Sequence, residues 1–305
     1  MPEEVEVRID QGIPLPILVG SMFALTLAST YFLAFIAVII YVQSHTNWLG
    51  IPSPREMDWA IRHFFGAATL FTIAALIYGL YSISDAGTDS TFIKLKGEPL
   101  SDEEREMFER FFHDPNSSHP SHTGSSHPSF NSSKIVKFIS NDINAWALGS
   151  IDHGYMSFST TSLELPEEQI KGIFLHEFGH LVSNDSKKMT FAKSFQNALV
   201  SFAMITPLKN FLKFTIFILT QLVLMKVSRE REYRADQFAV HIDEDNGIVS
   251  ALQSIKTSKL ELVDYGDAKV YMFSLPNIDS MFATHPPLEN RIARLTKSQI
   301  VSPTE

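Results

Sequence analysis

The sequence predicts an α+β fold that is mainly α-helical and contains one small β-sheet. Helices are favoured because two long apolar runs lack Lys, Arg, Asp and Glu, and because later segments repeat apolar residues at helical spacing. The sheet is favoured because three short runs with β-branched and aromatic residues lie between Asn, Asp and Gly turn signals. We therefore expect helices over most of the chain and strands in one part of it.

The two apolar runs, residues 13–42 and 64–84, are long enough to cross a bilayer, because a spanning helix needs about 20 apolar residues. Trp48 and Trp59 lie between them, as expected for a loop at the membrane interface. The amino terminus is acidic, whereas a secretory signal begins with basic residues, so we expect the first run to stay in the protein. Residues 1–90 are predicted to form a transmembrane hairpin, and a pair of buried core helices is the alternative.

The composition restricts the possible partners and metal ligands. Cysteine is absent, which excludes disulfides and thiolate metal sites, so that any metal must be bound by His, Asp or Glu. The net charge of −9 and the pI near 5.7 provide no basic surface for nucleic acid. We therefore expect the lipid bilayer, and not nucleic acid, as a partner.

Residues 91–133 are predicted to form an amphipathic helix followed by a linker. Ser101 and Glu104 have the spacing of a capping box, and Phe108 begins a group of aromatic residues at helical spacing. This helix is expected to rest either on the membrane surface or on a soluble domain. The stretch 113–133 is rich in Ser, Pro, Gly and Asn, and its histidines are interpreted as part of a solvated linker.

Residues 134–305 are predicted to form a soluble domain around the small sheet. An apolar stretch at about 195–226 is interrupted by Pro and Lys and is expected to associate with the membrane, as short spans, a re-entrant hairpin or a buried helical hairpin. Pro166, followed by two glutamates, marks the start of a helix. Strands are expected at residues 134–140, 143–148 and 155–160.

The predicted helix after Pro166 contains the string FLHEFGH at residues 174–180. Residues four apart share one face of a helix, so His176 and His180 can direct their imidazoles at one ion. Two neutral imidazoles suit Zn²⁺, which in catalytic sites has three protein ligands and a water molecule. Glu177 lies beside that point and can accept a proton from the water. This pattern indicates a hydrolytic zinc site, although the string alone is not specific.

A third ligand is offered by the stretch VSREREYRADQFAV, which also has an amphipathic helical pattern. Glu232 could complete the zinc shell, and Asp236, one turn later, could accept a hydrogen bond from the distal nitrogen of a ligand histidine. The alternative is a solvated helix face with ion pairs among Arg229, Arg231, Glu232 and Arg234. The residues alone leave both interpretations open.

Three separated motifs then carry a family resemblance. HEFGH, SREREYRAD and ATHPPLENRIARL follow one another in this order behind the predicted hairpin, and together they resemble the HtpX/Ste24-type membrane zinc metallopeptidases. The resemblance implies a gluzincin-like domain with the small sheet beside the zinc helix. It also implies one Zn²⁺ per chain bound by His176, His180 and Glu232, with Glu177 as general base and Asp236 supporting a ligand.

The resemblance also implies how a polypeptide substrate binds. Asn144, Ala145 and Trp146, in the string NAWA, would belong to an edge strand that pairs with an extended substrate, and an internal strand is the alternative. His285 would stabilise a developing oxyanion, or would instead brace a turn before the helix at 288–295.

The function that the resemblance implies is an endopeptidase that cleaves membrane proteins in protein quality control. The alternatives are a processing protease for one lipid-linked or other dedicated substrate, and a catalytically silent membrane scaffold. The resemblance places the chain as a multi-pass protein in a bacterial inner membrane with a cytoplasmic catalytic domain; a mitochondrial inner membrane is the alternative. The sequence makes no prediction of the oligomeric state.

Overall fold

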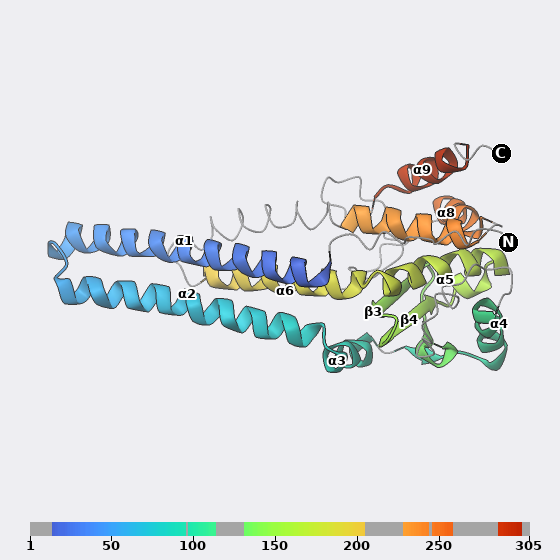
Figure 1. Ribbon diagram of the computed structural model, residues 1–305, viewed down its shortest axis with the longest axis horizontal. Coiled ribbons are helices and arrows are strands. Elements are labelled where there is room, and N and C mark those ends of the chain that lie inside the picture. Colours follow the sequence, from blue (N-terminus) through green and yellow to red (C-terminus); the bar gives the residue numbers. More distant parts are fainter. Residues whose placement is uncertain are drawn as a thin grey trace, which may run out of the picture. The chain divides into compact units, whose positions relative to one another are not determined.

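The computed structural model describes residues 14–95, 97–113, 131–204, 228–243, 246–258 and 286–300. The chain divides into two compact units (Figure 1). We call Ile13–Ser84 with Lys188–Leu224 the hairpin unit, and Met1–Gly12, Asp85–Lys187 and Met225–Glu305 the sheet unit. The domain limits predicted from the sequence, 1–90, 91–133 and 134–305, stay a prediction.

The hairpin unit contains two long helices, α1 (Leu15–Leu49) and α2 (Pro54–Ser82), which lie side by side (Figure 1). Both are long and apolar enough to cross a membrane. Helix α2 begins earlier than predicted because Ser53 and Glu56 form a capping box, in which the Ser53 N–H donates to Glu56 Oε2 over 2.7 Å. The capping box thus starts α2 before the apolar run, so that the first turn of the helix contains charged residues.

Many large apolar side chains of the hairpin are exposed. Phe32 is 62% exposed and Leu70 is 70% exposed, whereas the interface of the two helices buries Ala34 and Ala68 together with Leu33. Within that interface the hydroxyls of Thr30 and Thr72 are 2.9 Å apart and hydrogen-bonded. Small residues and hydroxyl pairs between helices, with large apolar residues outside, are typical of helices in lipid. This distribution favours the membrane hairpin over two core helices of a soluble protein.

Helix α6 (Asp185–Met204) begins in the sheet unit and continues into the hairpin unit. In the hairpin unit, Phe191 is fully buried in a cluster with Ala75, and the Ser194 and Ser82 hydroxyls are 3.2 Å apart. The predicted membrane-associated stretch 195–226 is thus helical as far as Met204, and its remainder lies outside the described residues.

The sheet unit is built on a four-stranded sheet of order β1-β2-β4-β3 among the described residues. Strand β2 is parallel to β4, and the two other pairs are antiparallel. The three predicted strands and the mainly helical α+β class are confirmed, whereas β1 is only two residues long and was not predicted. The strands are β1 (Glu98–Pro99), β2 (Ile135–Phe138), β3 (Ala145–Gly149) and β4 (Gly154–Ser159).

The two faces of this sheet bury different clusters. Ala145 and Phe158 belong to the main core with α5 (Glu167–Val182), whereas Trp146 belongs to a second cluster with residues of α3 (Asp85–Leu95). In that cluster the Trp146 ring lies 6.4 Å from the ring of Phe92. Because side chains alternate along a strand, Trp146 points away from the face that packs on α5.

Helix α4 (Asp102–His113) packs with its apolar face on β4 and α5 of the sheet unit. Phe108 is fully buried, with its ring centroid 4.8 Å from that of Phe158 and 5.8 Å from that of Phe174. Lys137 Nζ and Glu104 Oε2 are 2.8 Å apart and join the helix to β2. The apolar face of the predicted amphipathic helix is therefore buried in the core of the sheet unit, as expected for a helix that packs on a domain. Residues 114–130, with the other linker histidines, lie outside the described residues.

Glycines allow other helices to approach α5 closely. A Cβ added to Gly172 would lie 2.1 Å from the backbone nitrogen of Ile248 in α8 (Gly247–Thr257). A Cβ added to Gly179 would lie 3.0 Å from the ring of Phe238, in the helix 228–242. The C-terminal helix α9 (Leu288–Ile300) contributes two leucines to the same core. These packings place residues from three parts of the sequence around α5.

Candidate metal centre

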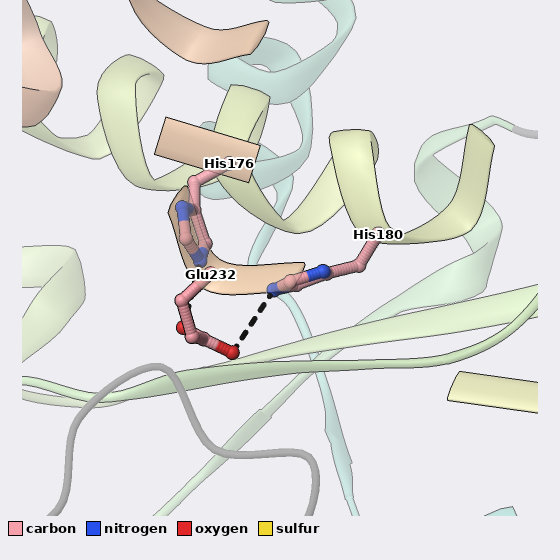
Figure 2. A group of neighbouring side chains, drawn as sticks. All are labelled: His176, His180 and Glu232. Carbon is pink, nitrogen blue, oxygen red and sulfur yellow. Dashed lines mark ion pairs between the residues drawn. The ribbon is translucent and has the colours of Figure 1, made fainter. Parts of the chain in front are cut away.

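The structure brings His176, His180 and Glu232 together in the interior (Figure 2). His176 Nε2 lies 3.5 Å from Glu232 Oε2, and His180 Nε2 lies 3.6 Å from Glu232 Oε1. The possible ligand atoms all lie within 4.8 Å of one another, and all three residues are buried. The histidines share one face of α5 because they are four residues apart, and the helix 228–242 supplies the carboxylate.

These distances fit a small divalent cation. Ligand atoms bound to tetrahedral zinc at 2.0–2.1 Å are separated by about 3.3 Å. The two separations between imidazole nitrogen and carboxylate oxygen, 3.5 and 3.6 Å, are close to this value, and all the possible ligand atoms lie within 4.8 Å of one another. The His-His-Glu group is thus positioned to bind a metal.

His176 is supported by two further buried side chains. Its Nδ1 lies 2.9 Å from Asp236 Oδ1, and Asp236 accepts a bidentate pair of hydrogen bonds from Arg291, at 2.8 Å from Nε and 2.6 Å from Nη2. Because a carboxylate can only accept hydrogen bonds, this contact favours the tautomer with the proton on Nδ1. The Nε2 lone pair of His176 is then available to a metal.

His180 is supported in the same way by a different pair. Its Nδ1 lies 3.1 Å from Asp185 Oδ2, and Arg234 Nη2 donates to Asp185 Oδ1 over 3.4 Å. Asp185 is the first residue of α6, and Arg234 lies in the helix 228–242 between Glu232 and Asp236. That helix therefore contributes a candidate ligand and also a supporting residue for each histidine.

Glu177 is placed to exchange a proton in this interior. Both of its carboxylate oxygens are buried without a hydrogen-bond partner among the described residues. Burial raises the pKa of Glu177 to about 8; the nearby His176 lowers this pKa and Glu232 raises it. A buried carboxylate with no donor is costly, so the site is suited to hold a cation or a polar ligand next to Glu177.

Burial and the neighbouring carboxylates shift the pKa values of the two histidines in opposite directions. Burial lowers the pKa of His180 to about 4, and the hydrogen bond to Asp185 only partly opposes this. Burial would lower the pKa of His176 too, but the neighbouring carboxylates of Asp236 and Glu232 raise that pKa above the ordinary value. His180 therefore already has the neutral form that a metal requires, and an ion would have to compete with a proton at His176.

The comparison with protein families identifies the chain. Residues 121–299 match the model of Peptidase family M48. The chain belongs to peptidase family M48. All the residues of the candidate metal centre lie within the matched range, so the cluster belongs to the part of the chain that defines the family.

This M48 chain is similar to curated HtpX proteases, which confirms the HtpX/Ste24-type resemblance. It is 27% identical over 179 residues to a protease HtpX homolog of Bacillus licheniformis, with 51% of this chain and 60% of that protein covered. It is 27% identical over 183 residues to the homolog of Neisseria meningitidis serogroup B, with 53% and 65% covered. The chain thus spans less than two thirds of the length of these relatives. A crystal structure of S. mikatae Ste24p aligns with a TM-score of 0.45 and 17% identity, covering 92% of this chain and 66% of that one.

Of the residues predicted to bind substrate, Asn144 and Ala145 lie at the start of β3, which is at an edge of the sheet. The Asn144 N–H donates to Ser162 Oγ over 2.8 Å, and Asn144 Oδ1 accepts from the Ala145 N–H over 3.0 Å. Asn144 is thus a buried residue that organises the start of the strand in the M48 chain.

The register of β3 shows which backbone groups point away from the sheet. Asn144 O accepts from the Ser159 N–H, so the pair Asn144–Ser159 and every second pair after it are hydrogen-bonded. Trp146 is such a residue and faces Ser157 of β4. The outward groups therefore belong to Ala145 and Ala147, and Ser186 Oγ donates to the Ala147 carbonyl over 2.6 Å.

Three residues of the centre were not found from the sequence, namely Asp185, Arg234 and Arg291. Arg291 could have been found, because it occupies the apolar stripe of α9 with Leu288 and Leu295, where an arginine needs a buried partner. Arg234 was interpreted as a member of ion pairs on a solvated helix face. His285, the predicted oxyanion residue, lies outside the described residues.

Proposed function

We propose that this M48 chain is a zinc-dependent endopeptidase anchored in a membrane by α1 and α2. The observation that carries the proposal is the buried group of His176, His180 and Glu232 with Glu177 next to it. A site that only stored or sensed zinc would have no need of a buried carboxylate beside the ligands. Zinc is favoured over harder cations because two of the three ligands are imidazoles.

In this proposal each residue of the site has a separate role in peptide hydrolysis. When bound, zinc polarises the peptide carbonyl and lowers the pKa of water at the site. Glu177 accepts a proton from that water and then donates it to the leaving amine, as general base and general acid. The supporting carboxylates Asp236 and Asp185 keep the imidazoles in the orientation that leaves Nε2 facing Glu232. His285, which lies outside the described residues, would stabilise the developing oxyanion, as the family resemblance implies.

An extended polypeptide would bind by adding a strand to the outer edge of β3. The Ala145 carbonyl and the Ala147 N–H would pair with the substrate, because the Ala145 N–H already donates to Asn144 Oδ1 and the Ala147 carbonyl already accepts from Ser186 Oγ. Asn144 would hold the start of the strand. Trp146 would act indirectly, because its side chain is 2% exposed and packs on the opposite face. Recognition of main chain accepts many sequences, which supports a role in quality control of membrane proteins. Processing of one lipid-linked substrate is the alternative.

The membrane arrangement is likewise proposed. Two spans return the chain to its starting side, so the amino terminus and the sheet unit would share a compartment, the cytoplasm of a bacterium. Multi-pass insertion is supported by the outward apolar side chains of α1 and α2.

Substitution of Glu177 by Gln tests the function directly. We expect Glu177→Gln to keep about the wild-type zinc content and to lose cleavage of an unfolded polypeptide by at least about 100-fold. Glu168→Gln is the matched control, because Glu168 is an exposed residue in the first turn of the same helix. Undiminished cleavage by Glu177→Gln would refute the mechanism. A wild-type protein that binds zinc and cleaves no polypeptide would instead support a silent scaffold.

A further inference from the structure

The first turn of α6 lies beside the metal centre because only Ser183 and Asn184 separate α6 from α5. Helix α5 ends at Val182, Ser183 follows as its cap, and Asn184 adopts a positive φ of 55°. Asn is one of the few residues that tolerate this conformation, and it commonly ends helices in this way. The Asn184 N–H donates back to the Leu181 carbonyl over 3.2 Å. The break between the two helices is therefore only two residues long, and the Asp185 carboxylate lies 3.1 Å from His180 Nδ1 near the end of α5.

Asp185 is held from several sides. Its side chain is 2% exposed, one oxygen lies 3.1 Å from His180 Nδ1, and the other accepts from Arg234 over 3.4 Å. The next residue, Ser186, ties the same turn to β3 by its hydrogen bond to the Ala147 carbonyl. The carboxylate thus has little freedom to move away from the imidazole.

We propose that Asp185 is a positioning residue of the metal centre, and that it fixes the ring orientation and the tautomer of His180. The carboxylate requires a proton on Nδ1, so Nε2 presents its lone pair to the point shared with Glu232. Arg234 orients Asp185 in turn, so the helix 228–242 supports His180 through Asp185 in addition to its own contact through Glu232. The inference rests on the proposed role of His180 as a zinc ligand.

The alternative is that Asp185 only stabilises the start of α6. An acidic side chain in the first turn of a helix interacts favourably with the helix dipole whether or not a histidine is near. In that case its replacement would reduce stability without affecting the metal. Metal affinity and the spectrum of a bound cobalt ion therefore separate the two roles.

The experiment uses the full chain in detergent and compares Asp185→Asn with Asp89→Asn. Asp89 is a matched control because its Oδ1 lies 2.7 Å from His153 Nε2, which is the same type of contact at a position without metal ligands. Zinc affinity is measured by competition with a chelator, and the visible spectrum is recorded at saturating Co²⁺. We expect Asp185→Asn to bind zinc about 10- to 100-fold more weakly with a changed cobalt spectrum, and Asp89→Asn to match the wild type in both.

Wild-type zinc affinity and cobalt spectrum in folded Asp185→Asn would overturn the inference. If Asp185→Asn does not fold, Arg234→Gln serves in its place, because it leaves Asp185 intact; we expect a several-fold weaker affinity, and an unchanged affinity would equally overturn the inference. A wild-type chain that binds no zinc would instead refute the proposed function, so the two failures are distinguishable.

Discussion

The two histidines of the candidate metal centre are supported by similar side chains in different surroundings. Asp236 and Arg291, behind His176, are each 1% exposed and joined by two short hydrogen bonds, at 2.6 and 2.8 Å. Behind His180, the contact between Arg234 and Asp185 is 3.4 Å long, and the Arg234 side chain is 21% exposed. Solvent screens the second pair more, so removal of its members should cost less.

The largest effect is expected for Arg291→Met. The substitution leaves Asp236 buried without its bidentate partner, and removal of one member of a buried ion pair costs about 3–5 kcal/mol. The free energy of unfolding in detergent measures the loss. Arg294→Met in the same helix is the control, because Arg294 is exposed and stacks on Tyr233 instead. Equal stability of the two variants would show that the Asp236–Arg291 pair is not the stronger support.

The next effect is expected for Asp236→Asn. Loss of this carboxylate weakens the hydrogen bond to His176 and leaves Arg291 without its counter-charge. We expect zinc affinity to fall by at least as much as in Asp185→Asn, about 100-fold, together with a loss of stability. Chelator competition checks the first and thermal unfolding the second. A smaller loss of zinc affinity than in Asp185→Asn would show that Asp185 supports the metal centre more strongly than Asp236 does.

The smallest effect is expected for Ser186→Ala. The substitution removes one buried hydrogen bond to Ala147, which contributes about 1 kcal/mol to stability. The contact of Asp185 with His180 remains, so zinc affinity should stay within about threefold of the wild type. Denaturant unfolding and chelator competition on the same preparation provide both values. A loss of affinity as large as that of Asp185→Asn would show that the turn, and not the carboxylate, positions His180.

The sequence predicted the parts of the site that depend on one helix. His176 and His180 come together because their spacing matches the helical repeat, and Glu232 and Asp236 share a face for the same reason. The position of Glu232 and Asp236 next to the histidines of α5 could be expected only from the family resemblance, because it depends on how two helices distant in sequence pack.

The contacts between supporting side chains on different helices were not predicted, because they also depend on how helices distant in sequence pack. Arg234 has acidic residues near it in its own helix. Nothing in the neighbouring sequence indicates that its partner is Asp185 and not one of these acidic residues. Asp185 itself follows a two-residue break after α5, in which Asn184 has a positive φ. For α4, the amphipathic pattern correctly predicted a helix with one apolar face, but the same pattern serves a membrane surface and a protein core equally.

The most direct test of the account is the zinc content of three purified proteins: the wild type, Glu232→Ala and Glu230→Ala. Glu230 is an exposed residue of the same helix and is not part of the cluster, so it controls for loss of a negative charge there. The account predicts about one zinc per chain in the wild type and in Glu230→Ala, and less than about a tenth of that in Glu232→Ala. A Glu232→Ala protein that is folded and retains the full zinc content would contradict it.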